Sequence, residues 1–173
     1  ELAEDAAKEN VRYMEVRYAP ILHQQQGLTL HNIVQAVLEG LKAAKKKYKD
    51  VPNPEPICFI GHSRGVDASL IISRKLSEVG VPVQLIISLD SVDQTVVTKN
   101  VRVCYNYWMP GFFPGTNLLR GIPLTREPGS TGKLYNINLN TDAPELKDPL
   151  TTHAVIDKAP KLQKRIEEEV LQA

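Results

Sequence analysis

The chain has 173 residues, a length that fits one domain and is short for two. Its 21 Lys and Arg oppose 20 Asp and Glu, so a net charge of +1 gives no electrostatic reason to expect nucleic acid or an anionic membrane as a partner. The acidic start, residues 1–5, is unlike a secretory signal, and no apolar stretch is long enough to cross a bilayer. We therefore expect a soluble, cytoplasmic protein.

Residues 1–50 predict a helix, a strand and a second helix. Residues 1–10 place small apolar side chains on one helical face, and residues 11–19 alternate with β-branched and aromatic residues, which is typical of a strand. Thr29 is a candidate N-cap for a helix whose apolar residues recur every three or four positions up to Ala44. If the strand at residues 11–19 is an edge strand, pairing with a second copy would give a homodimer.

The remaining chain alternates strands with helices. Three prolines between Val51 and Pro56 end the preceding helix, and an apolar run follows at residues 57–60, as in a strand covered on both faces. Further elements are expected as a helix at 66–79, strands at 83–89, 101–107 and 135–139, an irregular excursion at 108–132 and a last helix from Pro160. This order predicts one α/β domain, a three-layer α/β/α sandwich with a mainly parallel sheet of about five strands.

A glycine-flanked serine stands where the first apolar strand meets its helix. Gly61-His62-Ser63-Arg64-Gly65 has the GxSxG spacing of a nucleophile elbow, and side chains at both glycine positions are expected to collide with neighbouring backbone. The turn would expose the Ser63 hydroxyl, and the N–H of Arg64 at the helix start would face a developing oxyanion. The alternative is an ordinary glycine-containing turn between strand and helix.

A nucleophilic serine needs a base and a group that orients the base. Asp90 follows the next strand, at the edge where Ser63 is expected, although it could instead cap a helix or turn. His153 follows both in the chain order serine, acid, histidine, with a surface loop residue as the alternative. His62 is too close to Ser63 to take its proton. The weaker substitutes for the acid are Asp93 and Asp142.

Other chemistry finds little support in the sequence. The cysteines, Cys58 and Cys104, lie in apolar runs and are expected to be buried, reduced thiols. No clustered Cys/His spacing indicates zinc, and no glycine-rich phosphate loop indicates a nucleotide, so we expect no metal and no cofactor. The apolar loop residues Trp108, Phe112 and Phe113 could line a substrate pocket for a small ester or pack as a cap over the sheet.

Two different resemblances follow from these residues. From about Pro56 the chain resembles the α/β-hydrolase superfamily, in particular small lipase- or thioesterase-like members, through residues 61–65, Leu89-Asp90 and Thr151-Thr152-His153. This resemblance implies Ser63 as nucleophile, Asp90 as acid and His153 as base.

Residues 1–50 are similar to adenosine deaminases, through the stretches at residues 9–20, 27–30 and 37–41. Those enzymes are metal-dependent (β/α) barrels, but the matching stretch lacks their metal and substrate ligands, so zinc and adenosine are not expected.

The joining of two such parts suggests an engineered chimera with a junction near residues 49–56. In such a chimera the loop at residues 20–27 comes from the barrel, so we do not expect it to place a second backbone N–H against an oxyanion at Ser63. Loss of one such donor typically costs about 100- to 1000-fold in rate. We therefore expect an elbow with weak or no turnover. The alternative is an active serine esterase, lipase or thioesterase that forms an acyl-serine intermediate.

Overall fold

In a computed structural model, the protein is described at residues 27–48, 56–93, 96–110 and 121–173. The chain divides into two compact units, residues 1–57 and 58–173. The helix expected at residues 1–10, the strand at 11–19 and the junction at 49–55 lie outside the described residues. The expectation that all 173 residues form a single domain stays a prediction.

The first unit contains helix α2 (Leu30–Tyr48). Its start follows the prediction, because the backbone N–H of Asn32 donates to Thr29 Oγ1 at 3.2 Å and the N–H of Thr29 donates back to Asn32 Oδ1 at 3.2 Å. This reciprocal pair satisfies a helix N–H that has no acceptor within the helix. Ile33 and Leu38 are buried, as the helical spacing predicts. No helix in the described part of the chain is long and apolar enough to span a bilayer.

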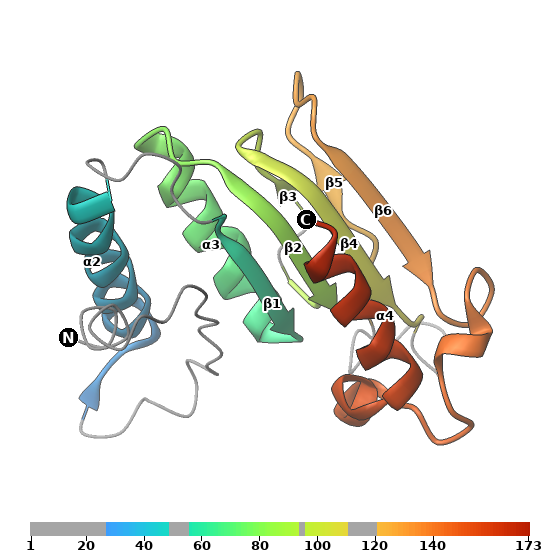
Figure 1. Ribbon diagram of the computed structural model, residues 1–173. Helices are drawn as coiled ribbons and strands as arrows, with labels where there is room; N and C mark the ends of the chain where they lie inside the picture. The colour runs from blue at the N-terminus through green and yellow to red at the C-terminus, as the bar shows by residue number, and fades with distance from the viewer. Residues whose placement is uncertain (1–26, 49–55, 94–95, 111–120) are drawn as a thin grey trace. The chain divides into compact units, whose positions relative to one another are not determined.

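The second unit is built on a four-stranded parallel sheet with the order β1-β2-β4-β6 (Figure 1). The strands are β1 (Cys58–His62), β2 (Val83–Leu89), β4 (Val101–Trp108) and β6 (Lys133–Asn138). Each position lies within two residues of its prediction. The central strand β2 is buried along almost its whole length, which explains its continuous apolar sequence.

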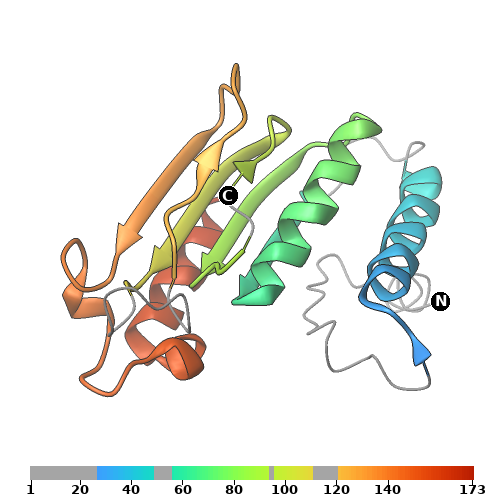
Figure 2. The same ribbon diagram turned by 180° about the vertical axis from the view of Figure 1, so that it is seen from behind.

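Helices cover both faces of this sheet. Helix α3 (Arg64–Glu78) lies on one face and α4 (Pro160–Leu171) on the other, as the two opposite views show (Figures 1 and 2). The α4 side holds a core in which Leu85, Ile87 and Tyr107 pack with Leu162 and Ile166. The α/β class with helices on both sides of a parallel sheet is therefore confirmed.

Part of the expected irregular excursion is ordered against the sheet. Residues 125–126 form strand β5 (Thr125–Arg126), which pairs with β3 (Val96–Val97) in a second, two-stranded sheet. A row of polar side chains also holds this segment: Ser88 Oγ donates to Asn106 Oδ1 at 2.6 Å, and Asn106 Nδ2 donates to Asn136 Oδ1 at 2.8 Å and to Ile122 O at 2.9 Å. Sequence reasoning missed β5 because a two-residue strand has no periodicity to detect.

Candidate functional site

Ser63 occupies the turn between β1 and α3 in a strained conformation. Its φ of 54° and ψ of −122° are unusual for a residue with a side chain. The backbone fixes the turn on both sides, because Ser63 N–H donates to Leu89 O at 2.8 Å and Ser63 O accepts from Val66 N–H at 3.0 Å. The serine is thus held at the carboxyl end of the sheet, beside the end of β2.

The two glycines of the turn have different roles. A Cβ on Gly61 would lie 2.7 Å from the backbone C and O of Gly65 and the N of Val66, so no side chain fits there. A Cβ on Gly65 would meet nothing within 4 Å. The expectation that both positions exclude a side chain is therefore right for Gly61 and wrong for Gly65, which lies within the first turn of α3.

Asp90 follows directly after β2 and is completely buried. It also has a positive φ, 52°, and its Oδ1 accepts a hydrogen bond from the backbone N–H of Met109 at 2.7 Å. Burial raises the pKa of the Asp90 carboxyl, and the Met109 and His153 hydrogen bonds oppose that rise. The hydrogen bond from the Met109 backbone therefore helps to fix the orientation of the Asp90 carboxylate.

His153 connects the other two residues. It is the first residue of a short 3-10 helix, η4 (His153–Lys158), and its Nδ1 lies 3.1 Å from Asp90 Oδ2 while its Nε2 lies 2.9 Å from Ser63 Oγ. An ionised Asp90 requires a proton on Nδ1, which leaves Nε2 free to accept the Ser63 hydroxyl proton. The structure therefore brings together the three residues proposed from the sequence, in a serine–histidine–aspartate hydrogen-bond chain.

The other residues that the sequence assigned to the site do not belong to this hydrogen-bond chain. Arg64 is the first residue of α3, where a backbone N–H has no acceptor within the helix. Trp108 is the last residue of β4 and is half-buried, whereas Phe112 and Phe113 lie outside the described residues. Neither substitute acid belongs to the site: Asp93 is exposed, and Asp142 accepts hydrogen bonds from Asn138 N–H and Thr141 Oγ1.

Sequence reasoning missed one residue at this site. His62 was considered only as a base, yet its Nε2 lies 2.7 Å from the backbone oxygen of His153, and the two imidazole rings are 5.1 Å apart. The only signal in the sequence was its position next to Ser63. The contact joins residues 91 apart in the chain, so no local pattern could have revealed it.

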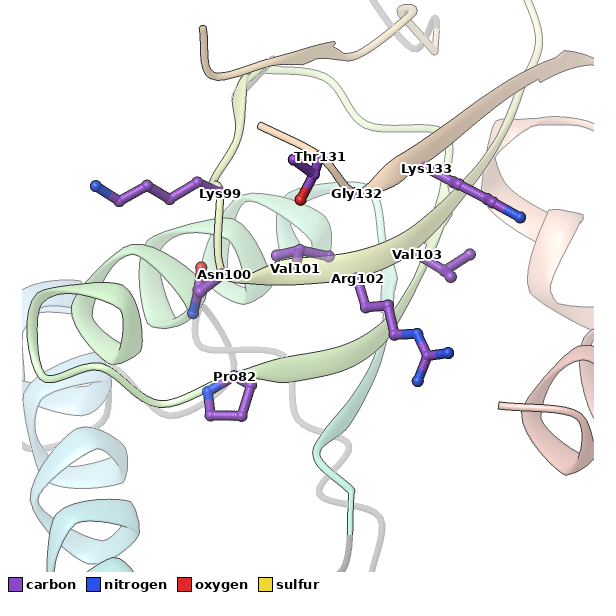
Figure 3. A pocket seen from close by; sticks show the side chains of 9 residues that line it. All are labelled: Pro82, Lys99, Asn100, Val101, Arg102, Val103, Thr131, Gly132 and Lys133. Carbon is purple, nitrogen blue, oxygen red and sulfur yellow. The ribbon is translucent and has the colours of Figure 1, made fainter. Parts of the chain in front are cut away.

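A separate hollow of about 610 Å³ lies at the opposite end of the strands, at the start of β4 and β6. Among the described residues, its lining includes three cations, Lys99, Arg102 and Lys133, and no acidic side chain. Figure 3 shows the side chains of Lys99 and Lys133 extending away from each other, on opposite sides of the hollow. Because the cations do not converge on one point, this hollow is not a built anion site.

Comparison with known proteins gives matches to adenosine deaminases. The family model described as adenosine deaminase matches residues 1–51. Similar relatives are the adenosine deaminases of Clostridium botulinum strain 657, 54% identical over 48 residues, and Vibrio atlanticus, 56% identical over 48 residues; each match covers 28% of this chain and 14% of the relative. That of Clostridium perfringens strain 13 is 41% identical over 63 residues, 36% of this chain and 19% of the relative. No solved structure matches the chain.

These findings correct the functional interpretation made from the sequence. The resemblance of residues 1–50 to adenosine deaminases is confirmed, but nothing in the matches supports an α/β-hydrolase portion or an engineered chimera. We expected a serine hydrolase with a nucleophile elbow, either with weak or no turnover or as an active esterase, lipase or thioesterase. Both expectations are wrong as statements of family and function. The positions of Ser63, Asp90 and His153 are a matter of geometry and do not depend on that family assignment.

Proposed function

We propose that residues 58–173 hold a nucleophilic serine site, with Ser63 as nucleophile, His153 as general base and Asp90 as the group that orients the base. The supporting observation is the chain of hydrogen bonds from Ser63 Oγ to His153 Nε2 at 2.9 Å and from His153 Nδ1 to Asp90 Oδ2 at 3.1 Å. The proposal concerns the reactivity of one hydroxyl. It names no family, and the small ester expected as a substrate stays an untested prediction.

The chemistry follows from the roles of the three side chains. As Ser63 Oγ bonds to an electrophilic centre, its proton moves to His153 Nε2, and the resulting imidazolium is stabilised by the buried Asp90 carboxylate. Negative charge that develops on the electrophile would face the N–H of Arg64 at the start of α3. The leaving group then takes the proton from His153, and a covalent adduct remains on Ser63.

A fluorophosphonate probe tests this reactivity without knowledge of the substrate. We expect the full chain to take up one probe per molecule at Ser63, with no labelling in Ser63→Ala and at least about a 100-fold slower reaction in His153→Gln. Ser77→Ala is the matched control, because Ser77 lies at the far end of α3 from Ser63. Labelling that persists in Ser63→Ala, or a wild-type protein that is not labelled at all, would refute the proposal.

A deaminase-like function is the second candidate, favoured by the match over residues 1–51 to relatives named adenosine deaminase. The matched stretch is only 14–19% of the length of those relatives. The described residues also hold no group of three His, Cys, Asp or Glu side chains that could bind a metal, so they do not fit the metal that this family implies. Loss of absorbance from adenosine on conversion to inosine, in the presence of added Zn²⁺, is the measurement, and an unchanged spectrum would remove this candidate.

A further inference from the structure

His153 is held at two points by two consecutive residues. Its ring meets Ser63 Oγ, and its backbone oxygen lies 2.7 Å from Nε2 of His62, the last residue of β1. A carbonyl oxygen can only accept, so His62 Nε2 must carry the proton and donate it. His62 therefore binds the main chain of His153, and the neighbouring Ser63 binds its side chain.

The chain just before His153 is held locally, because Thr151 N–H donates to Asp148 O at 2.9 Å and Asp148 N–H donates to Thr151 Oγ1 at 2.9 Å. The 3-10 helix η4 has no side-chain hydrogen bond at its N-cap, Thr152, which is exposed. Its buried anchor is Ile156, one turn further along. These contacts hold η4 to its own segment and to the core, whereas the His62 hydrogen bond ties the backbone oxygen of His153 directly to the end of β1. Without that bond, β1 would no longer oppose a small shift of the main chain at His153. The ring would then no longer reach Asp90 and Ser63 together.

We infer that His62 is a positioning residue, which holds the backbone of His153 so that its imidazole spans Asp90 and Ser63. This inference rests on the proposed nucleophilic role of Ser63. His62 acts through His153 and touches no reacting atom. A partner that orients a functional histidine typically contributes about 10- to 100-fold to activity, and a misplacement of about 1 Å can cost about 100-fold.

Two substitutions at His62 separate hydrogen bonding from bulk. In His62→Gln the side-chain amide Nε2 can donate from about the same reach, whereas His62→Met fills similar space without a donor. We expect the probe to react with Ser63 about 10- to 100-fold more slowly in His62→Met and within about threefold of the wild-type rate in His62→Gln. Both variants should unfold at a similar temperature to the wild type, as followed by Trp108 fluorescence. Equal rates in wild type and His62→Met, or equal losses in both variants, would overturn the inference.

A second measurement keeps this inference distinct from the proposed function. The proton between His153 Nδ1 and Asp90 should give a low-field signal in the proton NMR spectrum, whether or not Ser63 reacts with any probe. The signal should persist in His62→Gln and be lost or broadened in His62→Met. An unreactive wild type that shows this pattern would refute the nucleophile proposal and retain the positioning role. A signal unchanged in His62→Met would refute the positioning role alone.

Discussion

Substitution of Gly61 by alanine should destabilise the second unit, whereas the same substitution at Gly65 should not. The new Cβ at position 61 would lie 2.7 Å from three backbone atoms at the start of α3. Carbon atoms in contact are normally about 3.5 Å apart, so the first turn of α3 would have to move by about 0.8 Å. Overpacking of this kind costs about 1–3 kcal/mol of folding free energy.

Gly65 provides the matched control within the same turn. A Cβ there meets nothing within 4 Å, and the residue lies in a helix, where alanine is favoured over glycine by about 0.5–1 kcal/mol. The two variants therefore add the same methyl group four residues apart and should move stability in opposite directions.

Urea unfolding followed by the fluorescence of Trp108, the one tryptophan of the chain, reports on the second unit. With a denaturant slope of about 2 kcal/mol per molar urea, the midpoint of Gly61→Ala should fall by about 0.5–1.5 M and that of Gly65→Ala should rise by up to about 0.5 M. Equal midpoints for the two variants, or a neutral Gly61→Ala, would show that the strand and helix do not approach as closely as the structure has them.

Three further predictions concern the buried carboxyls. Asp90→Asn should slow probe labelling of Ser63 at least about 100-fold, because the amide no longer enforces a proton on His153 Nδ1. Labelling rates check this effect, and circular dichroism checks that the variant is still folded. Gly121→Ala should slow labelling about 10- to 100-fold, because its Cβ would lie 2.1 Å from Asp90 Oδ1, and a full-rate variant would contradict the packing. Burial raises the pKa of Glu169, which accepts from Tyr107 at 2.5 Å and Arg165 at 3.0 Å. Wild type should therefore lose stability relative to Glu169→Gln as pH rises from about 4.5 through the folded pKa, and urea midpoints that differ by a constant amount at pH 4 and 7 would refute this.

Local sequence patterns determined most of the secondary structure. The apolar runs at β1 and β2, the turn at Ser63 and the helical spacing of α4 each depend on residues that are neighbours in the chain, so their periodicity was readable. The candidate site could be assembled in outline for the same reason, because parallel strands place their carboxyl ends, and hence Ser63 and Asp90, at one edge. The functional label was wrong, since a short motif shared with a family does not establish membership of that family.

Only the tertiary structure decided which side chains meet. His153 lies 90 residues from Ser63 and 63 from Asp90, and the hydrogen bond from His62 to its backbone oxygen spans 91. Such contacts depend on how η4 packs against the sheet, which no local spacing encodes. The unequal roles of Gly61 and Gly65 were hidden for a different reason: they depend on the three-dimensional shape of the strand-to-helix turn, which brings the backbone of residues 65 and 66 against position 61 and leaves position 65 open.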